Sequence, residues 1–324
     1  MLKKINLAFS VYIKFLRNLT FPKFNYKLLI TLATLAFVGV SIAGNADKII
    51  KESIDFKSSI WLLIALSITL LSIIVNAFAW KMLFYNYDKK LFKLDLIALF
   101  VSTNIYKYLP GGVWHLIARL KALRSEFDFE CAISTVLFEP ILMLVAGLIL
   151  LPLGGLNFVF SFLCLLSPLL LISKFRAILV SKIRLIKFSK IEFDSEISLL
   201  NMDTKSTNTS YPLRAFSLEI LFVLIRFCGF WCCLHAFSIG NNLAINNLIS
   251  SFSLAWILGL VIPAAPGGVG VFESAIILRI GSIMPEAGLL ASLLCYRLVS
   301  TFADILGFLL FSVSDYFSGK SLYK

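Results

Sequence analysis

The feature that most constrains this chain is a series of long apolar stretches, each about the length of a membrane-crossing helix. A helix needs about 20 mostly apolar residues to cross the hydrocarbon core of a bilayer. Stretches of this kind occupy residues 28–44, 60–84, 131–151, 156–173, 213–237 and 286–316. Of the 324 residues, 59% are hydrophobic and 15% are charged, whereas soluble domains have about 45–50% apolar and about 25% charged residues. The sequence therefore excludes an ordinary soluble enzyme and predicts an all-α, polytopic membrane protein.

The net charge of +12 is concentrated in two segments. Residues 1–27 and residues 174–190 each contain six Lys or Arg residues and no acidic residue. Basic segments beside apolar spans are typical of cytoplasmic loops, where anionic lipid headgroups also attract them, so we expect no nucleic-acid partner. We expect a basic cytoplasmic or interfacial segment over 1–27, a single transmembrane domain over 28–318 and a short tail over 319–324. Both termini are expected on the cytoplasmic side of the plasma membrane.

Two further apolar stretches are peculiar because each runs into a Pro-Gly-Gly sequence. If residues 95–109 crossed the membrane, the basic segment 174–190 would lie outside the cell, against the usual cytoplasmic placement of Lys and Arg. If residues 95–124 enter and return from the same side, the basic segment lies inside. We therefore predict re-entrant, broken helical hairpins over 95–124 and 244–281, the second of which enters from the outside. The alternative is that one of the two is a true span.

An internal repeat supports this topology. The sequence Pro-Gly-Gly-Val occurs at 110–113 and again at 266–269. In each case the order is span, hairpin, span, which defines repeat units over about 60–151 and 213–316. One predicted span lies between the units, so they have opposite orientations. Inverted repeats with broken helices in corresponding positions are typical of transporters. The alternative is that the two matches are ordinary turns, in which Pro-Gly-Gly is common.

The two predicted breaks have a chemistry of their own. Non-helical backbone inside a membrane is tolerated only where it is buried in protein or lines a wet cavity. A helix that begins after Gly112 or Gly268 would direct unpaired N–H groups and a partial positive charge into the break. Such a site suits a phosphate or a carboxylate. The alternative is a kinked turn that neighbouring helices satisfy.

Ionisable residues inside apolar segments are a second signal, because a charge at the bilayer centre costs about 2.5–3.5 kcal/mol. These residues are Glu139, Arg226, Glu273, Arg279, Arg297 and Asp304, and His115 and Arg119 follow the first Pro-Gly-Gly sequence. The fork of a guanidinium group suits a lipid phosphate. The alternative is structural ion pairing, for example between Glu273 and Arg297. Asp304 is also open to interpretation as a hydrogen-bonded core residue.

The sequence predicts neither a metal nor a cofactor. The six cysteines lie in or beside apolar runs and form no Cys-x-x-Cys pair, and the two histidines are far apart. This pattern indicates buried apolar cysteines and not a zinc site. A phosphate-binding loop of the Gly-x-x-x-x-Gly-Lys-Ser/Thr type is also missing from the sequence, so we expect that ATP does not power this chain directly.

The two hairpins carry motifs of a known family. A first motif is matched by Asn104, Leu109-Pro110-Gly111, His115 and Arg119, and a second, Pro-x-x-Pro-Gly-Gly-x-Gly-x-x-Glu, is matched by Pro263, Pro266, Gly267, Gly268, Gly270 and Glu273. Over about residues 25–316 the chain resembles the flippase-like integral membrane family related to the transmembrane part of lysylphosphatidylglycerol synthases. The first motif is divergent, because Pro140 follows Glu139 where the family usually has an arginine.

This resemblance implies a lipid-translocating membrane domain, in a family often associated with cell-surface glycan synthesis. In the synthases a soluble aminoacyltransferase domain follows the membrane part, and we expect this chain to lack that activity and to have no catalytic residues. We predict that it translocates an anionic lipid, or a polyprenyl-phosphate-linked glycan precursor, between leaflets. Its expected partners are membrane lipids and surface-glycan biosynthesis proteins.

The predicted site holds the lipid phosphate at the helix starts after Gly112 and Gly268, with charge supplied by Arg119 and Arg297. Rocking of one unit against the other would switch access. The full set of predicted substrate-binding residues is Asn104, Pro110, Gly111, Gly112, His115, Arg119, Glu139, Arg226, Pro263, Pro266, Gly267, Gly268, Gly270, Glu273 and Arg297.

Two other functions stay open from the sequence. A membrane-embedded glycosyltransferase that uses a polyprenyl-linked donor would need a carboxylate at an aqueous face, and Asp47, Glu52 and Asp55 lie in the first predicted outer loop. The other possibility is a non-catalytic subunit of a surface-glycan assembly complex.

Overall fold

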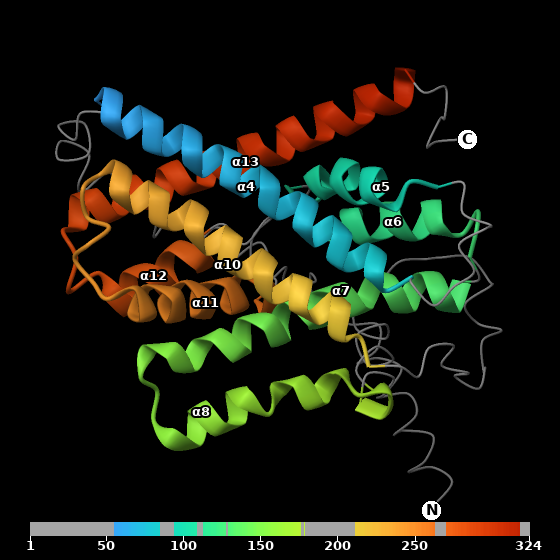
Figure 1. Ribbon diagram of the computed structural model, residues 1–324, viewed down its shortest axis with the longest axis horizontal. Coiled ribbons are helices and arrows are strands. Elements are labelled where there is room, and N and C mark those ends of the chain that lie inside the picture. Colours follow the sequence, from blue (N-terminus) through green and yellow to red (C-terminus); the bar gives the residue numbers. More distant parts are fainter. Residues whose placement is uncertain are drawn as a thin grey trace, which may run out of the picture.

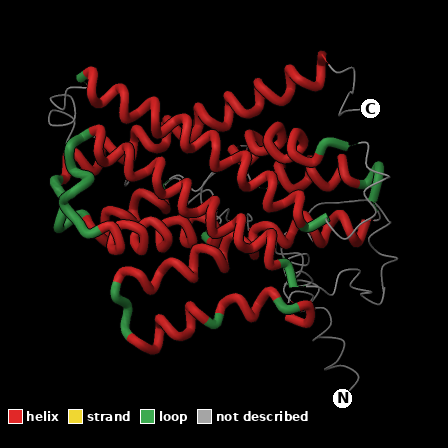
Figure 2. Tube along the Cα trace, in the orientation of Figure 1, coloured by secondary structure: helices red, strands yellow, loops and turns green. Residues whose placement is uncertain are grey.

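The computed structural model describes residues 55–84, 94–108, 113–127, 129–175, 178, 211–262 and 270–317. Within these residues the secondary structure is helical and no strand is present (Figures 1 and 2). The predicted all-α class is therefore confirmed. The predicted span at 28–44, the segment 1–27, the tail 319–324 and most of the basic segment 174–190 lie outside the described residues.

Four of the described helices are long and apolar enough to cross a membrane. They are α4 (Phe56–Met82), α7 (Phe129–Leu150), α10 (Leu213–Ala236) and α13 (Glu286–Phe317). Each coincides with a predicted span, which confirms a polytopic membrane protein. A 3-10 turn, η3 (Leu151–Gly154), extends α7.

The start of α4 is set by Asp55. Its carboxylate accepts a hydrogen bond of 2.7 Å from the backbone N–H of Ser58, which satisfies one of the free N–H groups of the first helical turn. This bond holds the pKa of Asp55 below its ordinary value. Asp55 was one of the carboxylates considered for glycosyl transfer, and in the structure it acts as a helix cap; Asp47 and Glu52 lie outside the described residues.

The predicted span at 156–173 is broken in the structure. It forms α8 (Phe158–Leu165) and a 3-10 helix, η4 (Ser167–Leu171). Pro168 lies at the start of η4, and because proline has no N–H it cannot continue the hydrogen bonding of α8. The two pieces together are shorter than the about 20 residues of a straight crossing, so this segment differs from the single helix that its hydropathy suggests.

Both predicted hairpins consist of short helices. The first comprises α5 (Leu96–Thr103), η2 (Asn104–Tyr108) and α6 (Trp114–Leu123), and the second comprises α11 (Ile245–Val261) and α12 (Val271–Ile280). Figure 1 shows α5 and α6 at one end of the bundle and α11 and α12 at the opposite end. Each hairpin therefore enters and leaves at the same end, in agreement with the predicted re-entrant topology. The breaks themselves, at 109–112 and 263–269, lie outside the described residues.

The two repeat units are packed in an inverted and reciprocal way. We call α4 to α7 unit one and α10 to α13 unit two. Helices α4 and α10 lie along each other and run in opposite directions (Figure 1). The second long helix of each unit packs on the other unit: α13 contacts α4 and α5, and α7 contacts α10 and α11. The core therefore lies at the interface between the units.

The contact between α4 and α10 depends on Gly229. A Cβ atom at this position would lie 2.6 Å from the Thr69 hydroxyl and 3.6 Å from the backbone oxygen of Ala65. A small residue lets the two backbones approach closely, as is usual where helices pack inside a membrane. This close approach aligns the polar side chains that α4 and α10 direct into the core.

Aromatic rings hold unit two together. Phe230, Phe252, Phe272 and Tyr296 come from α10, α11, α12 and α13, and all pairs of their ring centroids lie between 5.4 and 6.1 Å apart. These separations are in the favourable range for aromatic pairs. The cluster fixes the second hairpin against both long helices of its unit.

The outside of the bundle is apolar. Phe158 and Leu278 are each 83% exposed, and large apolar side chains are also exposed on α4 and α13. An apolar surface of this extent is unusual for a soluble monomer and fits a lipid environment. Polar side chains are instead concentrated in the interior, where they form the candidate site.

Candidate functional site

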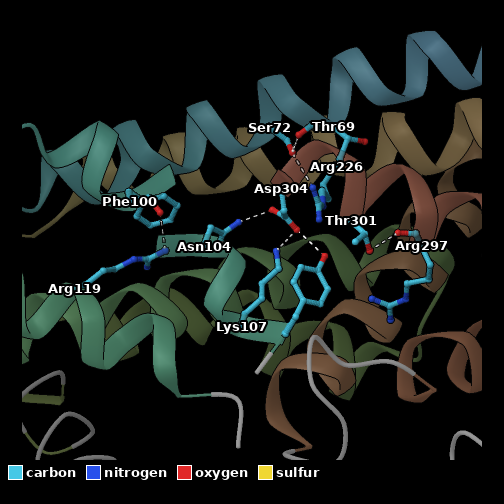
Figure 3. Close-up of polar contacts among 11 residues, drawn as sticks. Thr69, Ser72, Phe100, Asn104, Lys107, Arg119, Arg226, Arg297, Thr301 and Asp304 are labelled. Atoms are coloured by element: carbon cyan, nitrogen blue, oxygen red, sulfur yellow. Dashed lines mark hydrogen bonds and ion pairs between the residues drawn. The ribbon is translucent and has the colours of Figure 1, made fainter. Parts of the chain in front are cut away.

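Asp304 of α13 is the centre of a polar cluster at the interface between the units. Its carboxylate accepts hydrogen bonds of 2.7 Å from the amide of Asn104 and 2.7 Å from the hydroxyl of Tyr108. The ammonium of Lys107 lies 2.8 Å away and forms an ion pair with it. All three partners belong to η2, so Asp304 ties the tip of the first hairpin to a long helix of unit two (Figure 3).

Arg226 of α10 lies beside this cluster. It is 5% exposed, and one terminal nitrogen donates a long hydrogen bond of 3.4 Å to the hydroxyl of Ser72 on α4 (Figure 3). Its Nε atom has no hydrogen-bond partner among the described residues. Asp304, Tyr108 and Tyr296 are close enough to act on it electrostatically.

The cluster therefore holds more positive than negative charge. Lys107 and Arg226 interact electrostatically with each other, and Asp304 is the anion between them. A buried charge is costly unless it is paired and hydrogen-bonded. The buried Arg226 and the partly buried Lys107 are both close to one carboxylate, and Arg226 has an unused N–H, so a further anion would be stabilised here.

Arg119 of α6 is fully buried and has a different environment. It forms an ion pair with Glu139 of α7, and its Nε donates to the Thr103 hydroxyl at 3.1 Å. Its remaining nitrogen donates to the Phe100 carbonyl at 3.4 Å, and the guanidinium carbon lies 3.7 Å from the centroid of the Phe100 ring. Each guanidinium nitrogen is thus engaged within the protein. In this state Arg119 links α6 to α7, and its predicted contact with a lipid phosphate stays a prediction.

Glu273 of α12 and Arg297 of α13 form an ion pair, as the structural interpretation of these residues expected. The Glu273 carboxylate also accepts a 2.7 Å hydrogen bond from the N–H of Gly270 at the start of α12. Gly270 has φ of 86°, a backbone conformation that favours glycine. The Arg297 guanidinium lies 5.1 Å from the Phe272 ring centroid, so this predicted residue belongs to the wall of the aromatic cluster.

The two ion pairs occupy corresponding places in the inverted units. In unit one the second arm of the hairpin supplies Arg119 and the following helix supplies Glu139. In unit two the second arm supplies Glu273 and the following helix supplies Arg297. The two pairs therefore join equivalent helices, but the arginine and the glutamate have exchanged places between the units. Each pair fastens a hairpin to the long helix that follows it.

The structure brings together only part of the predicted site. Asn104 and Arg226 lie at the Asp304 cluster, whereas Arg119 with Glu139 and Glu273 with Arg297 form separate pairs. His115 lies half-buried in the first turn of α6. The predicted residues Pro110, Gly111, Gly112, Pro263, Pro266, Gly267 and Gly268 lie outside the described residues. Among the described residues, no group of His, Cys, Asp and Glu side chains could hold a metal ion.

Three residues of the interior were missed by the sequence analysis. Lys107 and Tyr108 directly precede the first Pro-Gly-Gly break, but their place beside Asp304 depends on a residue nearly two hundred positions away. Glu219 of α10 is 1% exposed and lies seven residues before Arg226, on the same helical face. It satisfies the same rule, a charge within an apolar stretch, that selected Arg226, so the signal was present.

The comparison with known families bears on this arrangement. A model of the lysylphosphatidylglycerol synthase TM region matches residues 26–307. The chain belongs to this family. The matched residues include the predicted span at 28–44, all of unit one, and unit two as far as residue 307 of α13. Membership and the apolar helices together establish a multi-pass membrane protein. A search of the curated proteins found no significant match.

Proposed function

We propose that this protein moves an anionic lipid, either a phospholipid or a polyprenyl-phosphate-linked glycan precursor, between the leaflets of the plasma membrane. The observation that carries the proposal is the buried, positively charged cluster at the interface of two inverted units. Lys107 and Arg226 outnumber Asp304 there, and the Nε of Arg226 lacks a partner within the described part of the chain. Intramembrane ionisable residues of this kind usually mark a substrate pathway.

The cluster suits a phosphate for chemical reasons. The planar fork of Arg226 can donate two parallel hydrogen bonds to phosphate oxygens, and Lys107 adds a compact positive charge. Asp304 keeps Lys107 in place in the absence of a ligand. The acyl or prenyl chains would stay in the bilayer beside the apolar surface, while the headgroup crosses through the polar interior. Movement of one unit against the other would open the cluster to each leaflet in turn.

The distribution of charge supports a cytoplasmic location for the first hairpin. Lys81, Lys121, Arg124 and Arg214 lie where α4, α6 and α10 begin or end, all at the end of the bundle that holds α5 and α6 (Figure 1). Lys and Arg near the ends of spans favour the cytoplasmic side. On this orientation α13 ends on the cytoplasmic side (Figure 1), and the cytoplasmic position of the N-terminus stays a prediction.

The test is reconstitution into phosphatidylethanolamine vesicles with a fluorescent phosphatidylglycerol and a fluorescent polyprenyl phosphate as probes. Arg226→Gln should slow translocation at least about tenfold, because a charge-assisted hydrogen bond contributes about 1.5–3 kcal/mol. Arg226→Lys, which keeps the charge and loses the fork, should be intermediate. Arg279→Gln is the matched control, since Arg279 is exposed on α12, and should behave as wild type.

Thermal unfolding of each variant separates loss of function from loss of folding. Wild-type rates in a well-folded Arg226→Gln protein would remove the cluster from the mechanism. A wild-type protein that moves neither probe alone, yet co-purifies with a glycan polymerase, would favour the assembly-subunit alternative.

A further inference from the structure

Glu219 is a buried carboxyl group that the proposed phosphate site does not use. It lies on the inward face of α10 and is 1% exposed. Its Oε1 accepts no hydrogen bond from any described residue. A carboxylate in this position has lost its water and has gained no partner at that oxygen, which is a costly state for an ion.

The surroundings of Glu219 do not neutralise it. The titratable groups on the described parts of the helices packed against α10 are Lys57 and Lys81 of α4, Cys131 and Glu139 of α7, and Glu286, Cys295, Tyr296, Arg297 and Asp304 of α13, with none on α11. Among these, Glu139 is the group that acts electrostatically on Glu219, and it carries the same charge. On α10 itself, Arg214 is exposed and Arg226 is engaged with the Asp304 cluster.

The cation that pairs with Glu139 has no capacity left for Glu219. Arg119 pairs with Glu139, and its other nitrogens donate to the Thr103 hydroxyl and the Phe100 carbonyl. Glu219 is buried without a partner at Oε1 and faces the like charge of Glu139, so the two carboxyl groups together are expected to hold one proton. Because Glu139 has the ion pair, the proton resides on Glu219.

We propose that Glu219 binds a proton that is released and rebound in each transport cycle, which couples lipid movement to a proton gradient. This proposal rests on the proposed function. On release, the O–H bond of Glu219 breaks, its electron pair stays on the carboxylate, and the proton passes to water on one side of the membrane. A proton from water on the other side restores the acid. The cycle consumes and produces nothing else.

The contacts around Glu219 link its protonation state to the phosphate cluster. An ionised Glu219 would repel Glu139, the partner of Arg119, and so disturb the link between α6 and α7. Arg119 belongs to the same hairpin as Lys107, whose ammonium is paired with Asp304. Movement of the hairpin therefore changes the environment of the phosphate cluster. The coupling would pass from Glu219 through Glu139 and Arg119 to the hairpin that carries Lys107.

The presence of the proton can be tested without any transport assay. Infrared difference spectroscopy on purified protein at neutral pH should show the band of a protonated carboxyl group, and Glu219→Gln should remove it. Glu286→Gln, at an exposed position at the start of α13, should leave the band unchanged. Identical spectra for wild type and a folded Glu219→Gln protein would overturn the proton site. If Glu219→Gln does not fold, Glu219→Asp is the second variant, and it should shift the band of the protonated carboxyl group. An unshifted band in Glu219→Asp would also overturn the proton site.

The coupling is tested in vesicles that carry a pH difference, with the membrane potential clamped to zero by valinomycin and equal potassium. One proton per lipid allows a difference of about one pH unit to shift the steady-state distribution of the fluorescent probe by up to about tenfold. We expect the shift in wild type and in Glu286→Gln, its loss in Glu219→Gln, and its loss when nigericin abolishes the gradient.

The outcomes separate this proposal from the proposed function. Translocation that ignores the pH difference, or that follows a sodium gradient instead, overturns proton coupling and leaves lipid translocation standing. A wild-type protein that moves no probe under any gradient overturns the proposed function and the coupling with it, while the infrared result still decides whether Glu219 holds a proton.

Discussion

Asp304 accepts contacts from an amide, a phenol and an ammonium group, all from η2. Asn104 and Lys107 are three positions apart and therefore lie on the same side of this 3-10 helix, and Tyr108 is the next residue. The carboxylate is fully enclosed by this set, whereas the Lys107 side chain is 23% exposed. The stability of the hairpin tip therefore depends on a single residue from the other unit.

Replacing Asp304 should destabilise the protein through the cation that it leaves behind. Asp304→Asn should lower the free energy of unfolding by about 2–3 kcal/mol, near the lower bound for breaking a buried ion pair because Lys107 is partly exposed. Asp304→Asn with Lys107→Met should recover part of this loss, since no unpaired charge remains. Thermal unfolding in detergent measures both. If the double variant is no more stable than the single one, the ion pair is not the source of the stability.

At the scale of elements, the hairpins were predictable and the break in the middle span was not. The hairpin at 95–124 followed from the charge of a distant loop, because insertion constrains where Lys and Arg lie. The interruption near Pro168 falls inside an apolar run that looks continuous in hydropathy. The packing of α7 and α13 against the opposite unit could not be predicted either. An apolar helix has the same pattern of hydropathy whichever neighbour it packs on.

Two glycines offer a matched test of helix packing. A Cβ at Gly229 meets the Thr69 hydroxyl at 2.6 Å, whereas a Cβ at Gly259 on α11 meets nothing within 4 Å. Replacing a helical glycine by alanine raises the free energy of unfolding by roughly 0.5–1 kcal/mol where there is room for the methyl group. Overpacking lowers it by about 1–3 kcal/mol. Gly259→Ala should therefore raise the unfolding temperature and Gly229→Ala should lower it. Equal shifts in the two variants would mean that α4 and α10 are not in close contact.

At the scale of the whole molecule, the two ends of the bundle carry different charge and different hairpins. Lys81 is in the last turn of α4 and Arg124 directly follows α6, whereas Asn242 and Ser282 lie just before α11 and just after α12. Figure 1 shows α5 and α6 at one end of the bundle and α11 and α12 at the other. If the first hairpin crossed the membrane, Lys81 and Arg124 would lie on opposite sides. The site was less predictable than this layout, because Asp304, the partner of Lys107 and Tyr108, comes from a helix far away in sequence.

Cysteine labelling can determine on which side of the membrane each of these positions lies. In a Cys228→Ser background, which removes the one exposed cysteine of the described residues, Lys81→Cys and Arg124→Cys should react with an impermeant maleimide from the same side. Asn242→Cys and Ser282→Cys should react from the other side. Labelling of Lys81→Cys and Arg124→Cys from opposite sides would replace the re-entrant hairpin by a true span.

The reciprocal packing of the units has a consequence for biogenesis. Asn104 is 200 residues from Asp304 along the chain. At about 5–20 residues per second of synthesis, the tip of the first hairpin waits roughly 10–40 s for its partner. Lys107 must spend that interval in the translocon or the lipid without its counter-ion. The nascent first half is thus a natural client for a membrane insertase that shelters polar residues until the second half arrives.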